Sequence, residues 1–150
     1  MPIRRRHLEF YTDGAYSSKT QMGGWATVCL EDGDLIDEQS GYEPYSTNNR
    51  MELTAVIEGL KALKVPCRVT VVTDSQYVAN GINLGWAEGW KANNWRKKDK
   101  KPALNPELWD ALLNEIARHE VTIQWIKGHA GHPENERCDE MAVAESQKFM

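Results

Sequence analysis

Hydrophobic and polar positions alternate in the first third of the chain with the two-residue period of β-strands. Residues 8–12 predict a first strand. Residues 25–30 and 35–42 predict two more, and they flank the sequence EDGD, whose Asp32-Gly33 pair is a hairpin turn signal. We therefore expect the first three strands to form an antiparallel meander.

The period then lengthens to that of a helix in residues 46–63, with Thr47 or Asn48 as the candidate N-cap. The positions expected to face the core are Leu53, Val56, Ile57, Leu60 and Leu63. A β-branched run at residues 68–73 predicts a fourth strand, and the chain after it reads as mostly helical.

Residues 105–119 predict a further helix, with Asn105 as N-cap and Pro106 at the first helical position. Its apolar face would carry Leu108, Leu112 and Ile116. Alternation in residues 121–126 predicts a fifth strand, and a last helix begins at about Pro133. This order of elements predicts a mixed α/β fold, with the fourth strand parallel to its neighbours because a helical crossover precedes it.

Two aspartates follow predicted strands at the same kind of position. Asp13 comes after the first strand in FYTDG, and Asp74 comes after the fourth in VVTDS. If these strands are parallel neighbours, both carboxylates lie at their carboxyl ends, which is where open α/β sheets bind ligands. Each residue also has a structural interpretation, Asp13 as a turn residue and Asp74 as an N-cap.

Neighbouring carboxylates repel each other, and a divalent cation between them removes the repulsion. Oxygen ligands favour Mg²⁺ or Mn²⁺. Two more acids, Glu52 and Asp139, are expected in the first turns of their helices, where Glu52 could instead favour the helix dipole and Asp139 could be a surface residue. Four acids would suffice for two metal ions, an arrangement that hydrolyses phosphodiesters.

Length and composition indicate a single domain over residues 1–150, since 41% hydrophobic residues suffice for a core around one sheet. The chain has neither the apolar run of a membrane span nor the apolar segment of a secretory signal. We therefore expect a cytoplasmic protein with no membrane partner. Three cysteines without a C-x-x-C pair predict neither a disulfide framework nor a zinc site.

The charge is unevenly distributed, although the net charge is −4. Residues 91–101, KANNWRKKDKK, hold six basic residues and one acid, a local excess of +5 that leaves −9 for the rest of the chain. A basic segment that contains tryptophan suggests a local contact with nucleic-acid phosphates. A solvated loop is the alternative.

Five motifs together resemble bacterial type 1 ribonuclease H over nearly the whole chain: YTDG, TNNRMEL, TDSQYV, WRKKDKKP and, most specifically, WIKGHAGHPENERCDEMA. The resemblance implies the ribonuclease H-like fold, a five-stranded mixed sheet in the order 3-2-1-4-5 flanked by helices. It also implies a monomeric enzyme that cuts the RNA strand of RNA/DNA hybrids with two Mg²⁺ ions, for which Mn²⁺ can substitute. The products would carry 5′-phosphate and 3′-hydroxyl ends.

The resemblance also assigns roles to individual residues. Asp13, Glu52, Asp74 and Asp139 match the catalytic metal ligands, and His129 matches the catalytic histidine, for which a glycine-bearing loop and a pKa near neutrality are suitable. The positions that match substrate contacts are Gly14, Thr47, Asn48, Asn49, Gln76, Trp86, Trp90, Lys91 and Asn105. Asn48, Asn49 and Asn105 could instead cap helices, and at least one of Trp86, Trp90 and Trp95 is expected to be a core residue.

Some features depart from the family pattern. The loop around Lys19 lacks the usual Gly/Asn/Pro-rich sequence and is closer to the retroviral version, and Tyr45 stands where an arginine is common. The segment before the first tryptophan is one residue longer than expected, and about six residues before the first strand leave no room for a separate hybrid-binding domain. The alternatives are a relative that cuts DNA or double-stranded RNA, against which the hybrid-sensing amides argue, and an inactive hybrid-binding module, against which the complete set of acids argues.

Overall fold

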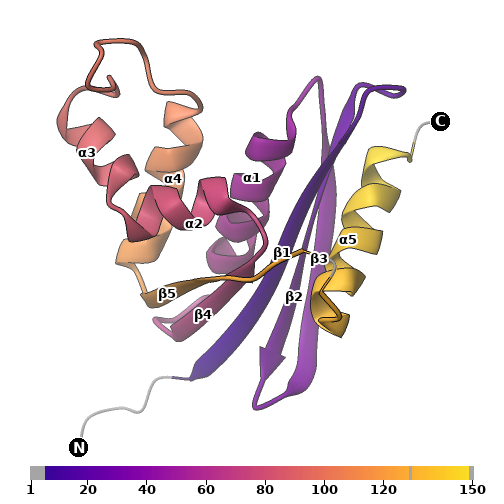
Figure 1. The fold of residues 1–150 in the computed structure, drawn as a ribbon. Coiled ribbons are helices and arrows are strands. Elements are labelled where there is room, and N and C mark those ends of the chain that lie inside the picture. Colours follow the sequence, from indigo (N-terminus) through magenta and orange to yellow (C-terminus); the bar gives the residue numbers. More distant parts are fainter. Residues whose placement is uncertain (1–5, 129, 149–150) are drawn as a thin grey trace, which may run out of the picture.

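The computed structural model describes residues 6–128 and 130–148 of the chain. Its elements follow one another as β1 (His7–Ser17), β2 (Met22–Glu31), β3 (Asp34–Pro44), α1 (Asn48–Lys61), β4 (Arg68–Thr73), α2 (Gln76–Asn83), α3 (Trp86–Ala92), α4 (Pro106–Ala117), β5 (Glu120–Trp125) and α5 (Pro133–Ser146). Figure 1 shows their arrangement. Each predicted strand and helix is present, and the helical middle of the chain consists of α2 and α3.

The strands form a mixed sheet in the order β3-β2-β1-β4-β5, as the family resemblance implied. The first three strands are an antiparallel meander, and β4 is parallel to both β1 and β5. Asp32 and Gly33, in the hairpin between β2 and β3, have φ of 52° and 84°. Positive φ at both central residues is what a type I′ turn requires. The predicted α/β fold class is therefore confirmed.

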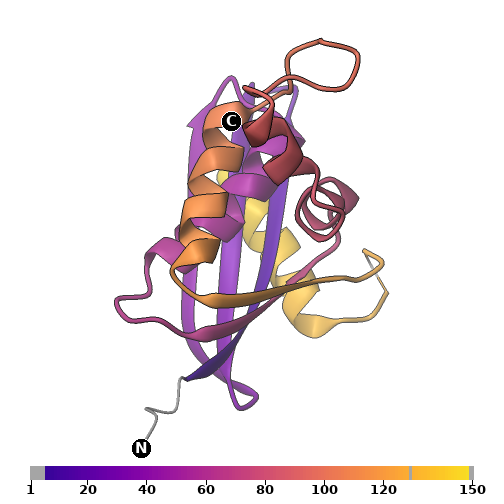
Figure 2. The ribbon, with the colours of Figure 1, turned by 90° about the vertical axis from the view of Figure 1, so that its left-hand side faces the viewer.

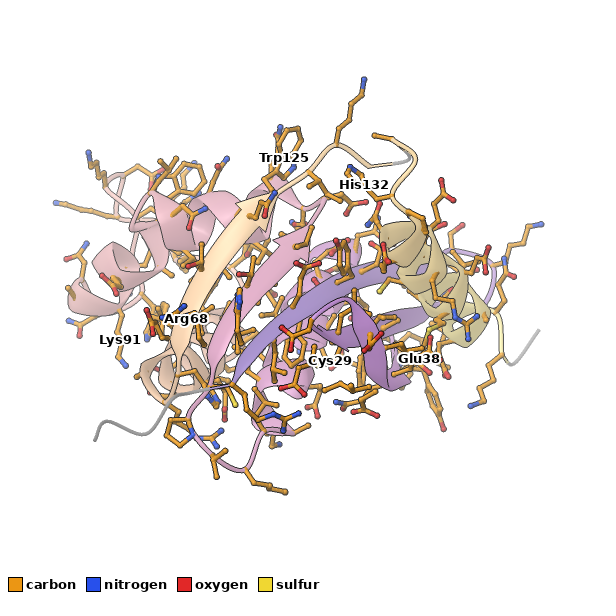
Figure 3. The ribbon with its side chains drawn as sticks, turned by 90° about the horizontal axis from the view of Figure 1, so that it is seen from below. Cys29, Glu38, Arg68, Lys91, Trp125 and His132 are labelled. Carbon is orange, nitrogen blue, oxygen red and sulfur yellow. The ribbon has the colours of Figure 1, made fainter. Side chains whose placement is uncertain are left out.

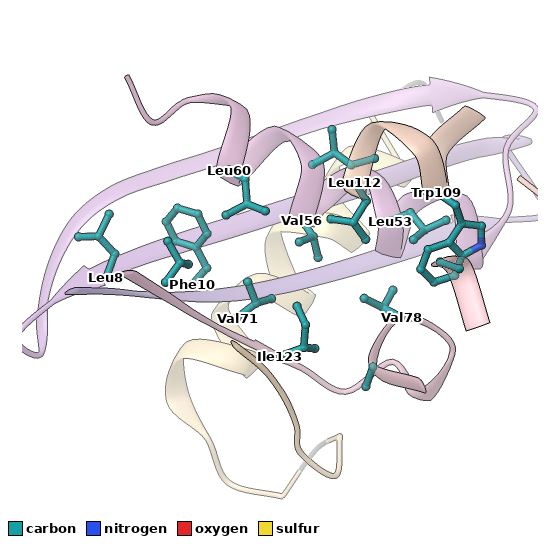
Figure 4. Packing of buried hydrophobic residues seen from close by; sticks show 14 of the residues in the cluster. Leu8, Phe10, Leu53, Val56, Leu60, Val71, Val78, Trp109, Leu112 and Ile123 are labelled. Atoms are coloured by element: carbon teal, nitrogen blue, oxygen red, sulfur yellow. The ribbon is translucent and has the colours of Figure 1, made fainter. Parts of the chain in front are cut away.

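Helices cover both faces of the sheet (Figures 1 and 2). On one face, α1 packs on β1 and α4 packs on α1 and β5, around a core that includes Phe10, Val56 and Trp109 (Figure 4). On the other face, α5 packs against β2 through Cys138 and Ala142. Burial of this apolar area on two sides is the main force that holds the acidic edge of the sheet in place.

The predicted core face of α1 is largely confirmed: Leu53, Val56, Ile57 and Leu60 are buried, and Leu63 is partly buried. Thr47 is the N-cap, since its side chain accepts a 3.1 Å hydrogen bond from the backbone N–H of Arg50. Asn48, the other candidate, is the first helical residue. The longest described helices, α1 and α5, have 14 residues. No helix of the described segments is long and apolar enough to cross a membrane.

The apolar face of α4 follows the prediction, with Leu112 buried and Leu108 and Ile116 partly buried. The prediction missed Trp109, a fully buried residue of the same helix. All three cysteines are buried and free. Burial raises the pKa of the Cys138 thiol, which keeps it protonated and unreactive.

Candidate metal centre and nucleic-acid interface

Asp13 and Asp74 occupy the same level of the sheet, although Asp13 does not end its strand as we expected. β1 continues to Ser17 because its second half remains paired with β2. Its parallel ladder with β4, however, ends at the pair Thr12 and Thr73. Asp13 follows Thr12 and Asp74 follows Thr73 in the sequence, so both carboxylates lie where the parallel ladder ends.

Glu52 reaches this edge from α1, whose backbone passes unusually close to β1. A β-carbon on Gly14 would come to 2.5 Å from the carbonyl carbon of Met51, and nearer still to the backbone nitrogen of Glu52. Only glycine permits this approach. Glu52 is the fifth residue of α1 and Asp139 the seventh of α5, so both acids belong to second turns and not to the expected first turns.

Asp13, Glu52 and Asp74 form a compact cluster in which one ligand oxygen from each lies within 4.8 Å of the others. Asp139 lines the same cavity but is outside this group of three. The structure therefore places three of the four predicted acids in one cluster and the fourth, Asp139, elsewhere in the lining of the same cavity. Asp13 is 4% and Glu52 8% exposed, so the like charges are also shielded from water.

Burial and mutual repulsion strongly raise the pKa values of two of these acids, Asp13 and Glu52. Burial is the largest cause that raises the pKa of Asp13 to about 7, and the charges of Asp74 and Asp139 add to it. Burial also raises the pKa of Glu52 well above its usual range, followed by the charge of Asp13 and the hydrogen bond to it.

The donor set fits a divalent cation. All three clustered ligands are carboxylate oxygens, which hard cations such as Mg²⁺ and Mn²⁺ prefer. The Oε2 atom of Glu52 is buried, and within the described part of the chain no hydrogen bond reaches it. A buried acceptor of this kind costs free energy unless a cation or proton satisfies it.

The surroundings of Asp74 exclude one structural interpretation. Ser75, not Asp74, caps α2, since its hydroxyl accepts a 3.2 Å hydrogen bond from the N–H of Val78. The loop after β5 packs against the Asp74 carboxylate, and a β-carbon on Gly128 would lie 2.8 Å from its Oδ2. The Asp74 side chain thus faces the cluster and this loop.

A cavity of about 440 Å³ opens over the acids. Four of the predicted substrate-binding residues line it: Gly14, Asn48, Asn49 and Gln76. The two asparagines and the glutamine are exposed, so their amides can contact a ligand. Tyr77 also lines the cavity and was missed; its place in the quoted motif TDSQYV was the available signal.

Thr47 and Asn105 lie outside this cavity and are connected through Arg50, a residue that was not predicted to belong to the site. Arg50 donates to the Asn105 side-chain oxygen at 3.4 Å and forms ion pairs with Glu43 and Glu107. Asn105 is the N-cap residue of α4, but its side chain makes no capping hydrogen bond. It donates instead to the hydroxyl of Tyr77 at 3.2 Å.

The predicted tryptophan and lysine contacts lie on α3. Trp86 is 43% exposed, and its ring centroid is 6.4 Å from that of Trp90, with which it lines a cavity of about 490 Å³ together with Arg96 and Lys98. Trp90 and Trp95 also pack against the core, as expected of at least one of the three. Lys91 forms a 2.8 Å ion pair with Asp110 of α4, so its ammonium is partly neutralised.

His129 lies outside the described residues, so its predicted catalytic role stays a prediction. His132, labelled in Figure 3, is the N-cap residue of α5 and makes no side-chain capping hydrogen bond. Among the departures from the family pattern, Tyr45 is 81% exposed, and the turn with Lys19 lines a separate cavity of about 370 Å³ beside the end of α5.

Fold and site define an α/β protein with a carboxylate cluster at the carboxyl edge of its parallel strands. The RNase H family model matches residues 5–147. The chain therefore belongs to the RNase H family. It is 54% identical to ribonuclease H of Rhizobium johnstonii over 137 residues, 91% of this chain and 89% of that protein. It is 51% identical to ribonuclease H of Desulforamulus reducens over 139 residues, 93% and 87% of the two chains.

Similar solved structures include the crystal structure of LC9-RNase H1, a type 1 RNase H with the type 2 active-site motif. It is 27% identical, with a TM-score of 0.85 over 100% of this chain and 76% of that one. The resemblance to bacterial ribonuclease H and the ribonuclease H-like fold are both confirmed.

Proposed function

We propose that the protein cleaves the RNA strand of RNA/DNA hybrids endonucleolytically, leaving 5′-phosphate and 3′-hydroxyl ends. The observation that carries the proposal is the cluster of Asp13, Glu52 and Asp74 beneath an amide-lined cavity, in a chain of the RNase H family. We expect it to act as a monomer.

Asp13, Glu52 and Asp74 would hold one Mg²⁺ ion, and Asp139 would complete a second site when substrate is bound; Mn²⁺ can substitute. Bound divalent ions make water a stronger nucleophile and stabilise the charge on the leaving oxygen. The acids of this chain fix where that charge compensation occurs. Their raised pKa values mean that they bind a cation only as they release protons.

We assign proton transfer near the scissile phosphate to His129, by its match to the family histidine. A histidine has a suitable pKa for this step, and the neighbouring Gly128 brings the loop against Asp74. The test is replacement of His129 by Ala, which should lower kcat and flatten the pH profile while hybrid binding persists.

Hybrid selection is assigned to the exposed amides of Asn48, Asn49 and Gln76. An enzyme that accepts a hybrid must sense a 2′-hydroxyl on one strand and its absence on the other, and amides can both donate to and accept from that group. All three line the cavity over the acids, so a strand read by them would pass beside the cluster.

The DNA strand would contact two more distant groups of residues. We assign a phosphate contact to Thr47 and Asn105, next to the guanidinium of Arg50. We assign sugar and backbone contacts to Trp86, Trp90 and Lys91 on α3, whose cavity also carries Arg96 and Lys98. Basic side chains beside exposed aromatic rings are suited to a nucleic-acid backbone.

The test is cleavage of an end-labelled RNA/DNA hybrid with Mg²⁺, beside double-stranded RNA, double-stranded DNA and single-stranded RNA, each with and without chelator. We expect cleavage of the hybrid's RNA strand alone, and loss of it with chelator. Asp74→Asn should abolish cleavage and retain binding. Asp34→Asn, which removes an exposed acid in the hairpin between β2 and β3, is the matched control. Cleavage of DNA, or binding without cleavage even in Mn²⁺, would contradict the proposal.

A further inference from the structure

The indole of Trp125 is hydrogen-bonded to the backbone of a clustered acid. Its Nε1–H donates to the carbonyl oxygen of Asp74 at 3.0 Å. Trp125 is the last residue of β5 and pairs in register with Thr73, so its side chain extends one residue beyond the ladder to reach Asp74. Figure 3 shows Trp125 at this end of β5.

Two further hydrogen bonds lie beside this contact, at the junction between β4 and α2. The backbone N–H of Ile126 donates to the carbonyl of Thr73 at 2.9 Å, and the N–H of Ser75 donates to the Thr73 hydroxyl at 3.0 Å. These two bonds fix the backbone on either side of Asp74. The Trp125 bond holds the Asp74 carbonyl, which belongs to the same peptide group as the Ser75 N–H, so this plane is held at both its carbonyl and its N–H. The orientation of this plane helps to set the direction in which the Asp74 side chain leaves the backbone.

We propose that Trp125 is a positioning residue for Asp74: its indole N–H holds the Asp74 carbonyl so that the carboxylate keeps its place in the cluster of three acids. The inference rests on the proposed function for the identity of the metal that the cluster binds. Groups that orient a metal ligand contribute to metal affinity although they never touch the ion.

Exposure separates this role from ordinary packing. Trp125 is 45% exposed, whereas Ile123, two residues earlier on the same face of β5, is 5% exposed. Loss of part of a half-exposed ring removes little buried apolar area. Loss of the hydrogen bond to Asp74 should therefore be the main effect of a replacement at residue 125. It should weaken metal binding by the cluster more than it lowers the stability of the metal-free protein.

The test compares two replacements at residue 125 in the full chain. Trp125→Phe removes the N–H and part of the ring, while 3-benzothienylalanine at position 125 removes only the N–H because sulfur replaces nitrogen in a ring of the same shape. Trp25→Phe, on β2 and outside the lining of the cavity over the acids, is the matched control. For each protein we would measure Mg²⁺ and Mn²⁺ affinity by calorimetry, the rise in Tm on adding Mg²⁺, and kcat and KM for the hybrid.

We expect both replacements at residue 125 to weaken metal binding by about tenfold, with a smaller metal-induced rise in Tm and a lower kcat at unchanged KM. The control should match the wild type. Unchanged metal affinity with a lower metal-free Tm would overturn the inference in favour of a structural role. So would a benzothienyl protein that behaves as the wild type, or a wild type that binds neither ion. A wild type that binds Mg²⁺ but cleaves no hybrid would overturn the proposed function alone, because metal affinity would still report on Trp125.

Discussion

A β-carbon on residue 14 would collide with the backbone nitrogen of Glu52, so Gly14 and Glu52 are in direct backbone contact. Gly14 follows Asp13 on β1, and Glu52 belongs to α1. The contact therefore sets the separation of two clustered acids that come from different elements. Gly14, which the family resemblance assigned to substrate binding, has a structural task that its position next to Asp13 did not reveal.

Gly14→Ala should push α1 away from β1. The added methyl group meets backbone atoms, which cannot move aside as a flexible side chain could, so we expect a loss of about 1 to 3 kcal/mol in the free energy of unfolding. Metal affinity should fall as well, because Glu52 moves with α1. Denaturant unfolding and calorimetry would measure the two effects. Gly89→Ala, where a β-carbon meets nothing within 4 Å, is the stability control and should be neutral or stabilising.

The pH dependence of stability follows from the raised pKa of Asp13. Because this pKa is about 7 in the folded protein and 3.8 for an unperturbed aspartate, the unfolding free energy of the metal-free protein should fall as pH rises from about 4 through 7. Asp13→Asn removes this loss and also the repulsion on Glu52. It should therefore be more stable than the wild type by about 2 kcal/mol at pH 8 and by much less at pH 4. Equal differences at the two pH values would contradict the assignment.

Metal removal should separate the roles of Asp74 and Asp139. With no substrate, Mg²⁺ should raise the Tm of the wild type, and chelator should reverse the rise. Asp74→Asn should abolish most of this rise, since Asp74 belongs to the group of three oxygens. Asp139→Asn should retain most of it and still lose hybrid cleavage. Glu140→Gln, the exposed neighbour on α5, controls for the change of charge. Equal loss in the two aspartate variants would show that Asp139 binds the first ion.

Asn105 offers a test that separates backbone geometry from contact with the substrate. Its φ of 56° is easy for glycine and costs alanine about 1 kcal/mol. Both Asn105→Gly and Asn105→Ala lose the side chain that bonds to Tyr77 and Arg50. We expect both to bind the hybrid more weakly, and only the alanine variant to lose the additional stability. Binding equal to that of the wild type in the glycine variant would rule out a substrate contact.

The fold was predictable from the sequence because local pattern and tertiary environment agree in most elements. β4 was predicted to the residue, since its apolar run is buried in the middle of the sheet. The predicted end of β1 was wrong because antiparallel pairing with β2 continues beyond the parallel ladder. Nothing in the alternation of residues 8–12 shows which of two neighbouring strands ends first.

The candidate site was only partly predictable. The matched positions of Asp13 and Asp74 indicated a shared edge, but their distance from Asp139 depends on how α5 packs on the sheet. Arg50 and Tyr77 were missed because each acts through contacts between elements that are distant in the sequence, such as the bond from Asn105 to Tyr77. The bond between Trp125 and Asp74 is of the same kind.

The buried cluster of like charges also bears on protein engineering. A screen that ranks variants by heat resistance without metal would favour any replacement that removes Asp13 or Glu52. Burial deprives each of these carboxyl groups of hydration, which destabilises the folded protein when the group is charged. The variants enriched in such a screen would be inactive under the proposed function. Screening in the presence of Mg²⁺ would reverse this preference, so the buffer would decide whether selection preserves or eliminates the active site.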